Sequence, residues 1–187
     1  MTSESVLVIC TGNICRSPVA EALLSDGLES NGLMIRSAGT HAMLGHPPAP
    51  EAIAYVRGTI GDFPHRLGQQ LDRSVAQQAT LLLTMTEQQR SWVLRTAPRA
   101  IRRTFTLLEF ARIAQSLPQN ATFSSLQDLV QACTPLRRKC LRPGARNSIP
   151  DPYGLSPEAY AESFAQVHRA CGEIIPALRH RLPTSSR

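Results

Sequence analysis

The chain has 187 residues, of which 42% are hydrophobic, and this is enough apolar sequence to build the core of one globular domain. No apolar run approaches the roughly 18 residues of a transmembrane helix, and no signal peptide is recognisable, so we expect no membrane partner. The net charge of +6 suits anionic partners, but aromatic residues are only 5% and recognition motifs are absent, which argues against nucleic-acid binding.

Strands and helices are predicted to alternate along the chain, from hydrophobic periodicity and from Gly and Pro breakers. The N-terminal half should contain a strand at 5–10, a helix at 17–30, a strand at 33–38, a loop at 39–50, a helix at 51–57 and a turn at 62–65. A short helix from Asp72, a strand at 80–85 and a helix at 86–94 should follow. The last elements are a strand at 103–106, helices at 107–115 and 124–133, and a long helix at 158–182 that Pro176 kinks or breaks.

This alternation predicts an α/β three-layer sandwich, in which helices cover both faces of a four-stranded parallel sheet. We expect one domain over 1–182 and a flexible tail at 183–187. Within it, 98–150 is an extended basic insert, where we expect extra helices and a mobile loop.

The stretch from Cys10 to Pro18 reads C-T-G-N-I-C-R-S-P and directly follows the first apolar strand. A cysteine and an arginine six positions apart, with Gly12 between them, predict a loop whose backbone N–H groups form a nest for an anion. The next helix directs its positive end at the same point, and Arg16 supplies a planar pair of donors for phosphate oxygens. This positive field favours the thiolate of Cys10, so the loop indicates phosphoryl transfer through a cysteine.

The string V-I-C-T-G-N-I-C-R-S-P-V-A-E-A resembles the phosphate-binding loop of the bacterial low-molecular-weight protein tyrosine phosphatases. Ser37-Ala38-Gly39-Thr40 resembles the second loop of that family, and Asp151-Pro152-Tyr153 resembles its general-acid loop. The three motifs occur in the family's order and lie near both ends of the chain. The resemblance implies a hydrolase that removes phosphate from phosphotyrosine in proteins, through a phosphocysteine intermediate.

By this resemblance, Cys10 is the nucleophile, Arg16 binds the phosphate, and Asp151 is the general acid and then the base for water. Without the resemblance, Asp151-Pro152 would be read as an ordinary turn. The implied substrate-binding residues are Thr11, Gly12, Asn13, Ile14, Cys15, Ser17, Met43 and Tyr153. Ser37 and His65 would support Asn13, although His65 is equally well explained as a surface turn residue, and Ser17 as a helix N-cap.

Two other activities on the same fold stay open. A protein arginine phosphatase is one, but related enzymes tend to place threonine where this chain has Ile14, and a bulky Ile14 favours an aromatic phosphoester. A thiol-dependent arsenate reductase is the other, because Cys133 and Cys140 resemble a resolving pair. These two cysteines fall late in the chain, in the basic insert, so unrelated thiols are the preferred interpretation.

A third class is a non-catalytic phosphotyrosine-binding or redox-sensing module. Cys10 and Cys15 lie in one loop, and Cys15 is a candidate redox partner that forms a reversible disulfide with the nucleophile. The presence of Cys10, Arg16 and Asp151 together favours an enzyme.

The cysteine and histidine content sets the remaining expectations. Five cysteines, an odd number, do not indicate a disulfide framework, and a catalytic thiolate suits the reducing cytoplasm. The five histidines show no ligand spacing with the cysteines, so we expect no metal and no organic cofactor. The expected partners are a phosphotyrosine-containing protein and a phosphate or other oxyanion in the loop.

Overall fold

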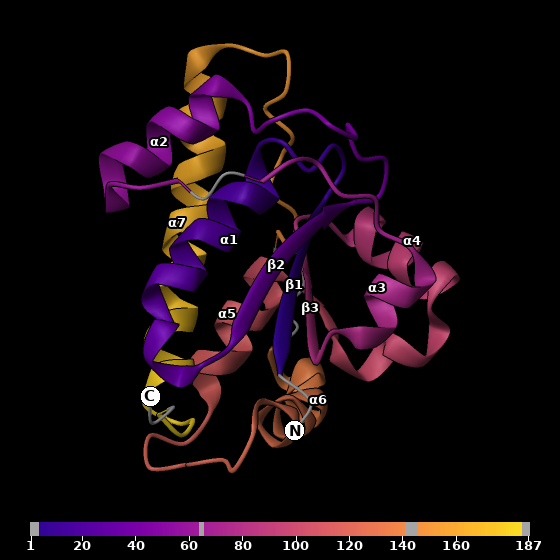
Figure 1. Cartoon of the computed structure of the whole chain (residues 1–187). Coiled ribbons are helices and arrows are strands. Elements are labelled where there is room, and N and C mark those ends of the chain that lie inside the picture. The colour runs from indigo at the N-terminus through magenta and orange to yellow at the C-terminus, as the bar shows by residue number, and fades with distance from the viewer. Residues whose placement is uncertain (1–3, 64–65, 141–145, 185–187) are drawn as a thin grey trace.

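A computed structural model of the chain describes residues 4–63, 66–140 and 146–184. Its described part contains a four-stranded parallel sheet in the order β2-β1-β3-β4, flanked by helices on both faces (Figure 1). The strands are β1 (Ser5–Cys10), β2 (Met34–Gly39), β3 (Leu81–Thr84) and β4 (Thr104–Thr106). The predicted three-layer α/β sandwich is therefore confirmed.

The central strand β1 is apolar throughout its middle because both of its faces are buried. Val6 and Val8 pack into the larger core cluster, whereas Leu7 and Ile9 pack into the smaller one on the other face. β1 pairs in parallel with β2 along its whole length, where Cys10 is aligned with Gly39, and with β3, where Ile9 is aligned with Thr84. The carboxyl ends of these strands consequently meet at one edge of the sheet, where such folds bind ligands.

The larger core lies beneath α1 (Arg16–Gly27), α2 (Pro50–Ile60), α5 (Leu107–Ser116), α6 (Leu126–Cys140) and α7 (Pro157–Arg179). The smaller core lies beneath α3 (Arg73–Gln78), α4 (Glu87–Thr96) and the 3-10 helix η2 (Pro98–Arg103). A further 3-10 turn, η1 (Glu29–Asn31), separates α1 from β2. Figure 1 shows α1 and α7 side by side on one face of the sheet and α3 and α4 on the other.

The observed helix starts agree with the prediction best where the sequence contains a recognisable N-cap residue. Thr86 and Gln89, at the T-x-x-Q spacing, form the capping box of α4, and Asp72 caps α3 through the Val75 N–H. The alternative interpretation of Ser17 as a helix N-cap is wrong: α1 begins at Arg16, its N-cap is Cys15, and Ser17 lies within the first turn.

Several helices end at other residues than predicted: α1 ends at Gly27 and not at 30, α2 at Ile60 and not at 57, and α6 and α7 also differ. α6 continues to Cys140, past Pro135, whereas the periodicity ended it at 133. α7 continues through Pro176 and ends at Arg179, short of the predicted end at 182. A proline removes one helical hydrogen bond, and tertiary packing of the flanking turns offsets that loss.

Part of the predicted basic insert, residues 98–150, belongs to the sheet and its covering helices and is not an insertion. β4 and α5 belong to the sheet and its covering layer, and α6 packs against α5 and η2. Arg137 of α6 lies over the Phe105 ring, with 4.2 Å between the guanidinium carbon and the ring centroid. The same side chain forms a 2.9 Å ion pair with the buried Glu109. Residues 141–145 of this segment lie outside the described part of the chain, and the expected mobile loop stays a prediction.

No helix in the described residues is long and apolar enough to cross a membrane.

Candidate active site

The loop between β1 and α1 is held in shape by backbone hydrogen bonds from the 39–50 segment. The carbonyl oxygens of Cys10, Thr11, Gly12 and Ile14 accept backbone hydrogen bonds, at 2.8 to 3.0 Å, from the N–H groups of Thr40, His41, Met43 and Ala49. These carbonyls therefore face the 39–50 segment, an orientation that suits the predicted nest of N–H groups. Among those N–H groups, that of Asn13 donates to Cys10 Sγ.

Gly39 permits this close approach of the two loops. A Cβ at this position would clash with the carbonyl oxygen of Thr11 and lie 3.0 Å from Ala42 Cα and Cβ. Position 39 therefore requires glycine because a side chain would not fit there, and not because the backbone adopts an unusual conformation.

The thiol of Cys10 is buried at the base of the loop and surrounded by polar groups. Its Sγ lies 2.9 Å from the hydroxyl oxygen of Ser17 and accepts a hydrogen bond from the Asn13 backbone N–H at 3.2 Å. Both contacts stabilise negative charge on sulfur when the thiol is deprotonated.

Asn13 supports the loop from within. It adopts the left-handed conformation, with φ of 57°, which asparagine tolerates better than most residues. Its side-chain amide donates to the hydroxyls of Ser17, at 2.9 Å, and Ser37, at 2.8 Å. Its Oδ1 accepts from the backbone N–H of Gln69 at 2.8 Å. His65, the second predicted support, lies outside the described residues.

The chain of hydrogen bonds continues to a buried carboxylate that the sequence analysis missed. The Ser37 hydroxyl donates to Glu21 Oε2 at 2.6 Å, and Arg66 forms a 2.9 Å ion pair with Glu21 Oε1. Burial raises the pKa of Glu21, and the hydrogen bond from Ser37 and the charge of Arg66 oppose that shift. Glu21 follows Ser17 by four positions on α1, so a helical projection would have placed the two on one face.

Arg16 and Asp151 lie together although 135 positions separate them. Arg16 is 1% exposed, and one of its terminal nitrogens donates to the Ile149 carbonyl at 2.9 Å. The other terminal nitrogen forms an ion pair with Asp151 Oδ2. The side chain of Asp151 is 44% exposed, so its carboxylate lies at the mouth of the site while the guanidinium lies inside.

The segment that carries Asp151 is anchored on both sides. The Ile149 N–H donates to the Met85 carbonyl at 2.8 Å, at the end of β3, and the Ser163 hydroxyl of α7 donates to the Pro150 carbonyl at 3.1 Å. Asp151 Oδ1 accepts from the Tyr153 N–H at 3.3 Å, which favours one orientation of the carboxylate.

A cleft of about 490 Å³ opens beside the loop. It is lined by three residues that the sequence analysis placed at the substrate, Ile14, Met43 and Tyr153, together with Tyr160 of α7, which it missed. Tyr153 is exposed and Tyr160 nearly buried. Hydrophobic and aromatic walls beside an anion-binding loop suit a phosphate attached to a flat apolar group.

The cleft lining does not include five of the predicted substrate-binding residues: Thr11, Gly12, Asn13, Cys15 and Ser17. The Thr11 hydroxyl accepts a hydrogen bond from Gln89 Nε2 of α4 at 3.0 Å, which ties the loop to the capping box of that helix. Cys15 is buried, and this burial raises the pKa of its thiol to about 12, with a further increase from the nearby Cys10.

The remaining predicted thiols lie elsewhere. Cys133 is fully buried on α6, and burial raises the pKa of its thiol to about 12. Cys140 ends the same helix and contacts Ser116. Within the described ranges, no cluster of three or more His, Cys, Asp or Glu residues could hold a metal ion.

Fold and site together define a class of protein: a parallel α/β sandwich with a cysteine-based anion loop after its first strand. The model of the family described as low molecular weight phosphotyrosine protein phosphatase matches residues 5–120. The chain therefore belongs to this family.

Individual relatives agree with this assignment. The low molecular weight protein-tyrosine-phosphatase Ptp of Acinetobacter johnsonii is 33% identical over 139 residues, which cover 71% of this chain and 94% of that protein. A protein-arginine-phosphatase of Geobacillus stearothermophilus is 34% identical over 105 residues, which cover 56% of this chain and 70% of that protein.

A solved structure extends the similarity beyond the matched sequence. The crystal structure of the tyrosine phosphatase Wzb from Escherichia coli K30 in complex with phosphate superposes with a TM-score of 0.68 and 26% identity. It covers 94% of this chain, and 99% of that chain is matched.

Proposed function

We propose that this member of the family hydrolyses phosphotyrosine in proteins through a phosphocysteine intermediate. The observation that carries the proposal is the convergence of the Cys10 thiol, the buried Arg16 guanidinium and the Asp151 carboxyl at one loop. A phosphate in this loop would meet a nucleophile below it, donors around it and an acid at its outer side, which is the arrangement needed for in-line transfer.

The first step forms a sulfur–phosphorus bond and breaks the bond between phosphorus and the phenolic oxygen. The Cys10 thiolate attacks, and Asp151, protonated at this stage, gives its proton to the leaving phenolate, which is otherwise a poor leaving group with a pKa of about 10. The second step forms a bond between phosphorus and the oxygen of a water molecule and breaks the sulfur–phosphorus bond. Asp151 accepts a proton from the attacking water, inorganic phosphate is released and the thiolate is regenerated.

The ion pair between Arg16 and Asp151 has a place in this cycle. A bound phosphate offers oxygens to the Arg16 nitrogen that Asp151 occupies, and bidentate pairing with phosphate is favourable for a guanidinium. Asp151 is then released toward the leaving oxygen, and it acts as the acid once it has taken up a proton from the bound phosphate monoester or from solvent. The loop N–H groups and Arg16 stabilise the equatorial oxygens in the transition state.

The remaining roles follow from position. We propose that Thr11, Gly12, Asn13, Ile14, Cys15 and Ser17 form the phosphate cradle and that Met43 and Tyr153 form the rim around the substrate ring. Ser37 supports Asn13. Cys15 is the candidate redox partner of Cys10; disulfide formation proceeds through a thiolate, and the raised pKa of the Cys15 thiol opposes its formation. The five cysteines of the described chain are free, which supports a cytoplasmic location.

Hydrolysis of phosphoarginine is the second candidate, because protein-arginine-phosphatases are among the relatives. Ile14 lines the cleft together with Met43 and Tyr153, which favours a flat apolar ring over a charged guanidinium. Arsenate reduction has weaker support, since the buried Cys133, on a helix away from Cys10, is poorly placed to resolve an intermediate on Cys10.

Steady-state release of phosphate from phosphotyrosine, phosphoserine and phosphoarginine peptides tests the proposal, with Cys10→Ser and the matched control Cys140→Ser. We expect release from phosphotyrosine that is lost in Cys10→Ser and retained in Cys140→Ser. Preferential release from phosphoarginine would replace the substrate but keep the mechanism. Full activity in Cys10→Ser would refute the mechanism.

A further inference from the structure

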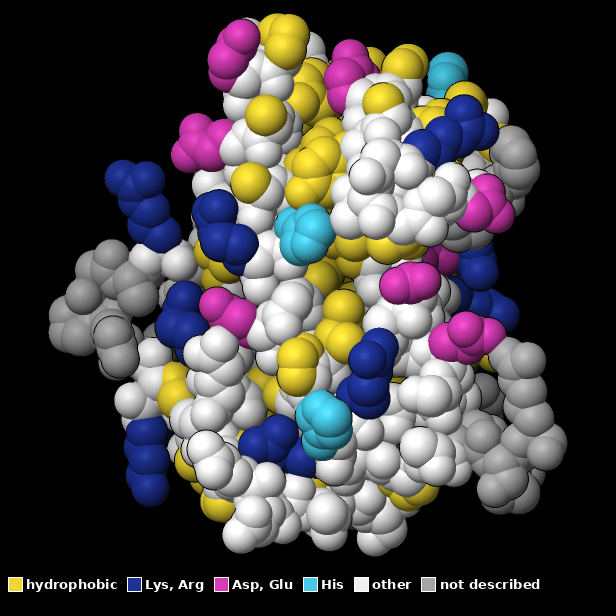
Figure 2. All heavy atoms as spheres, turned by 90° about the vertical axis from the view of Figure 1, so that its left-hand side faces the viewer, with side chains coloured by type: hydrophobic (Ala, Val, Ile, Leu, Met, Phe, Trp, Pro, Cys, Tyr) yellow, Lys and Arg dark blue, Asp and Glu magenta, His cyan; other side chains and the backbone are white. Residues whose placement is uncertain are grey.

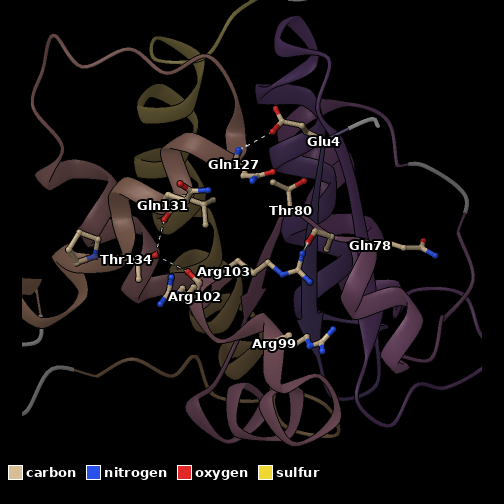
Figure 3. Close-up of a pocket in the computed structure, with 12 residues that line it drawn as sticks. Glu4, Gln78, Thr80, Arg99, Arg102, Arg103, Gln127, Gln131 and Thr134 are labelled. Atoms are coloured by element: carbon tan, nitrogen blue, oxygen red, sulfur yellow. Dashed lines mark hydrogen bonds between the residues drawn. The ribbon is translucent and has the colours of Figure 1, made fainter. Parts of the chain in front are cut away.

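A second pocket lies at the opposite edge of the sheet from the phosphate loop. It is lined by residues that precede strands, Glu4 before β1, Thr80 before β3 and Arg103 before β4, and by α6. Since all four strands are parallel, their amino ends share this edge, and the active-site loop lies at the other. Figure 3 shows the pocket between η2 and α6.

The pocket is positively charged. Three of its lining residues are arginines from one 3-10 turn, Arg99, Arg102 and Arg103, and its single carboxylate is Glu4. Glu4 is already engaged, because its two carboxylate oxygens accept the Leu126 and Gln127 backbone N–H groups of α6 at 2.8 and 2.9 Å. The Glu4 carboxylate thus compensates the positive N-terminal end of α6 rather than the charges of the three arginines.

The arginines differ in how firmly they are held. Arg103 donates to the carbonyls of Ala79, at 2.7 Å, and Gln77, at 3.0 Å, which fixes its guanidinium at the pocket wall. Burial lowers the pKa of Arg103, so a neighbouring anion would favour its charged form. Arg99 and Arg102 are exposed, and in the part of the chain that the structure describes neither forms an ion pair.

Charge is distributed differently on the face formed by α2 and α7. There, Figure 2 shows arginines interspersed with carboxylates and hydrophobic side chains. The pocket at the amino edge instead gathers three cations around a concave surface, which focuses their field on an anion.

Size and polar lining indicate the kind of anion. The volume of about 940 Å³ lies at the upper end of the roughly 300 to 1,000 Å³ typical of small-molecule sites. A single phosphate would leave most of it empty. Gln127 and Gln131 of α6 and the hydroxyls of Thr80 and Thr134 also line the pocket and supply donors and acceptors beyond the arginines (Figure 3).

We propose that this pocket is a second anion site that binds the polyphosphate chain of a small ligand. Arg99 and Arg102 contact the terminal phosphates, and Arg103 provides a fixed charge at the pocket wall. The glutamines of α6 contact the group that is attached to the polyphosphate. A nucleoside triphosphate and free polyphosphate share the chemistry that the arginines recognise. The site is independent of the phosphate loop, and the proposal does not rest on the substrate of that loop.

Calorimetric titration with ATP, inorganic tripolyphosphate and adenosine tests the site. The protein carries Arg16→Met, which weakens phosphate binding in the active-site loop, and its thermal melt is compared with that of the wild type. We expect one equivalent of ATP or tripolyphosphate to bind and adenosine to bind much more weakly. Equal affinities would identify the polyphosphate chain as the ligand, and tighter binding of ATP would show that the base is also contacted.

The charge-matched variants decide the location. Arg99→Gln with Arg102→Gln should reduce the affinity by about tenfold or more, whereas Arg95→Gln with Arg169→Gln, exposed arginines outside the pocket, should change it little. Neither pair should alter hydrolysis of a phosphotyrosine peptide in an otherwise wild-type chain. Absence of binding below about 1 mM, or equal losses in the two pairs, would overturn the proposal. Self-association abolished by the pocket pair alone, seen by sedimentation, would instead make the pocket an interface between two copies.

Discussion

At the scale of single residues, the site combines groups that act on phosphate with groups that hold them in position. Cys10 and Arg16 are placed by the short loop, but Asp151 is brought to Arg16 by a segment fixed to β3 and α7. A short sequence motif can specify the first pair, whereas the third partner depends on the whole sheet.

Asp151→Asn should lower kcat on phosphotyrosine by about 100-fold to 10,000-fold, because the phenolate must then leave unprotonated. Aryl phosphates with acidic phenols should lose much less, since their leaving groups need little assistance. Measuring kcat over a series of aryl phosphates checks this, with the surface substitution Asp128→Asn as control. An equal loss for every leaving group would show that Asp151 is not the acid.

Glu21 offers a test of the buried network through pH. Its folded pKa is raised by burial, so its contribution to stability is greatest below the unfolded pKa and is lost as pH rises through the folded pKa. Glu21→Gln keeps an acceptor for Ser37 without the charge. The melting temperature of the wild type should therefore fall relative to the variant as pH rises from about 4.5 to 7.5.

The control for this measurement is Glu162→Gln, an exposed glutamate on α7. Its melting temperature should follow that of the wild type across the same pH range. A melting-temperature difference between Glu21→Gln and wild type that does not vary with pH would contradict this prediction. It would mean that Arg66 and Ser37 stabilise the Glu21 carboxylate as fully as water does.

At the scale of elements, two segments shape the phosphate loop from behind. The segment after β2 engages the loop carbonyls, and Gln89 of α4 engages the Thr11 hydroxyl. The capping box of α4 was visible in the sequence, but the contact with Thr11 was not, because only the fold places α4 beside β1.

Gly39→Ala should impair both stability and activity, because the added methyl group would collide with the Thr11 carbonyl and with Ala42. A loss of about 1–3 kcal/mol of unfolding free energy is expected, measured by urea denaturation. The matched control is Gly58→Ala on α2, where a Cβ meets nothing within 4 Å. It should stabilise the protein by about 0.5–1 kcal/mol through helix propensity. Equal effects of the two substitutions would contradict this account.

At the scale of the molecule, the Arg137 side chain is one of the contacts that join α6 to the sheet edge. Arg137 pairs with the buried Glu109, which also receives Arg90 of α4, and lies over Phe105 of β4. The basic segment is therefore integrated with the core, and the pocket at the amino edge exists because α6 is held there.

Arg137→Met should cost about 3–5 kcal/mol of unfolding free energy, since it leaves the buried Glu109 carboxylate with only the longer Arg90 ion pair and the Thr106 N–H as partners. Arg138→Met, at the exposed neighbouring position, should be nearly neutral. Chemical denaturation of the two variants checks this. A loss below 1 kcal/mol for Arg137→Met, within the range of the control, would show that water compensates Glu109.

The sequence by itself determined the class of fold and the heart of the site. Alternating apolar segments specify strands and helices locally, and the Cys10-to-Arg16 spacing encodes the loop because its residues are neighbours in the chain. Only the tertiary structure decided which distant groups complete that loop: Glu21 through Ser37, Gln89 on Thr11, and the segment that carries Asp151. Such contacts depend on strand order and layer packing, which local propensity does not contain, and the same packing created the arginine pocket at the opposite edge of the sheet.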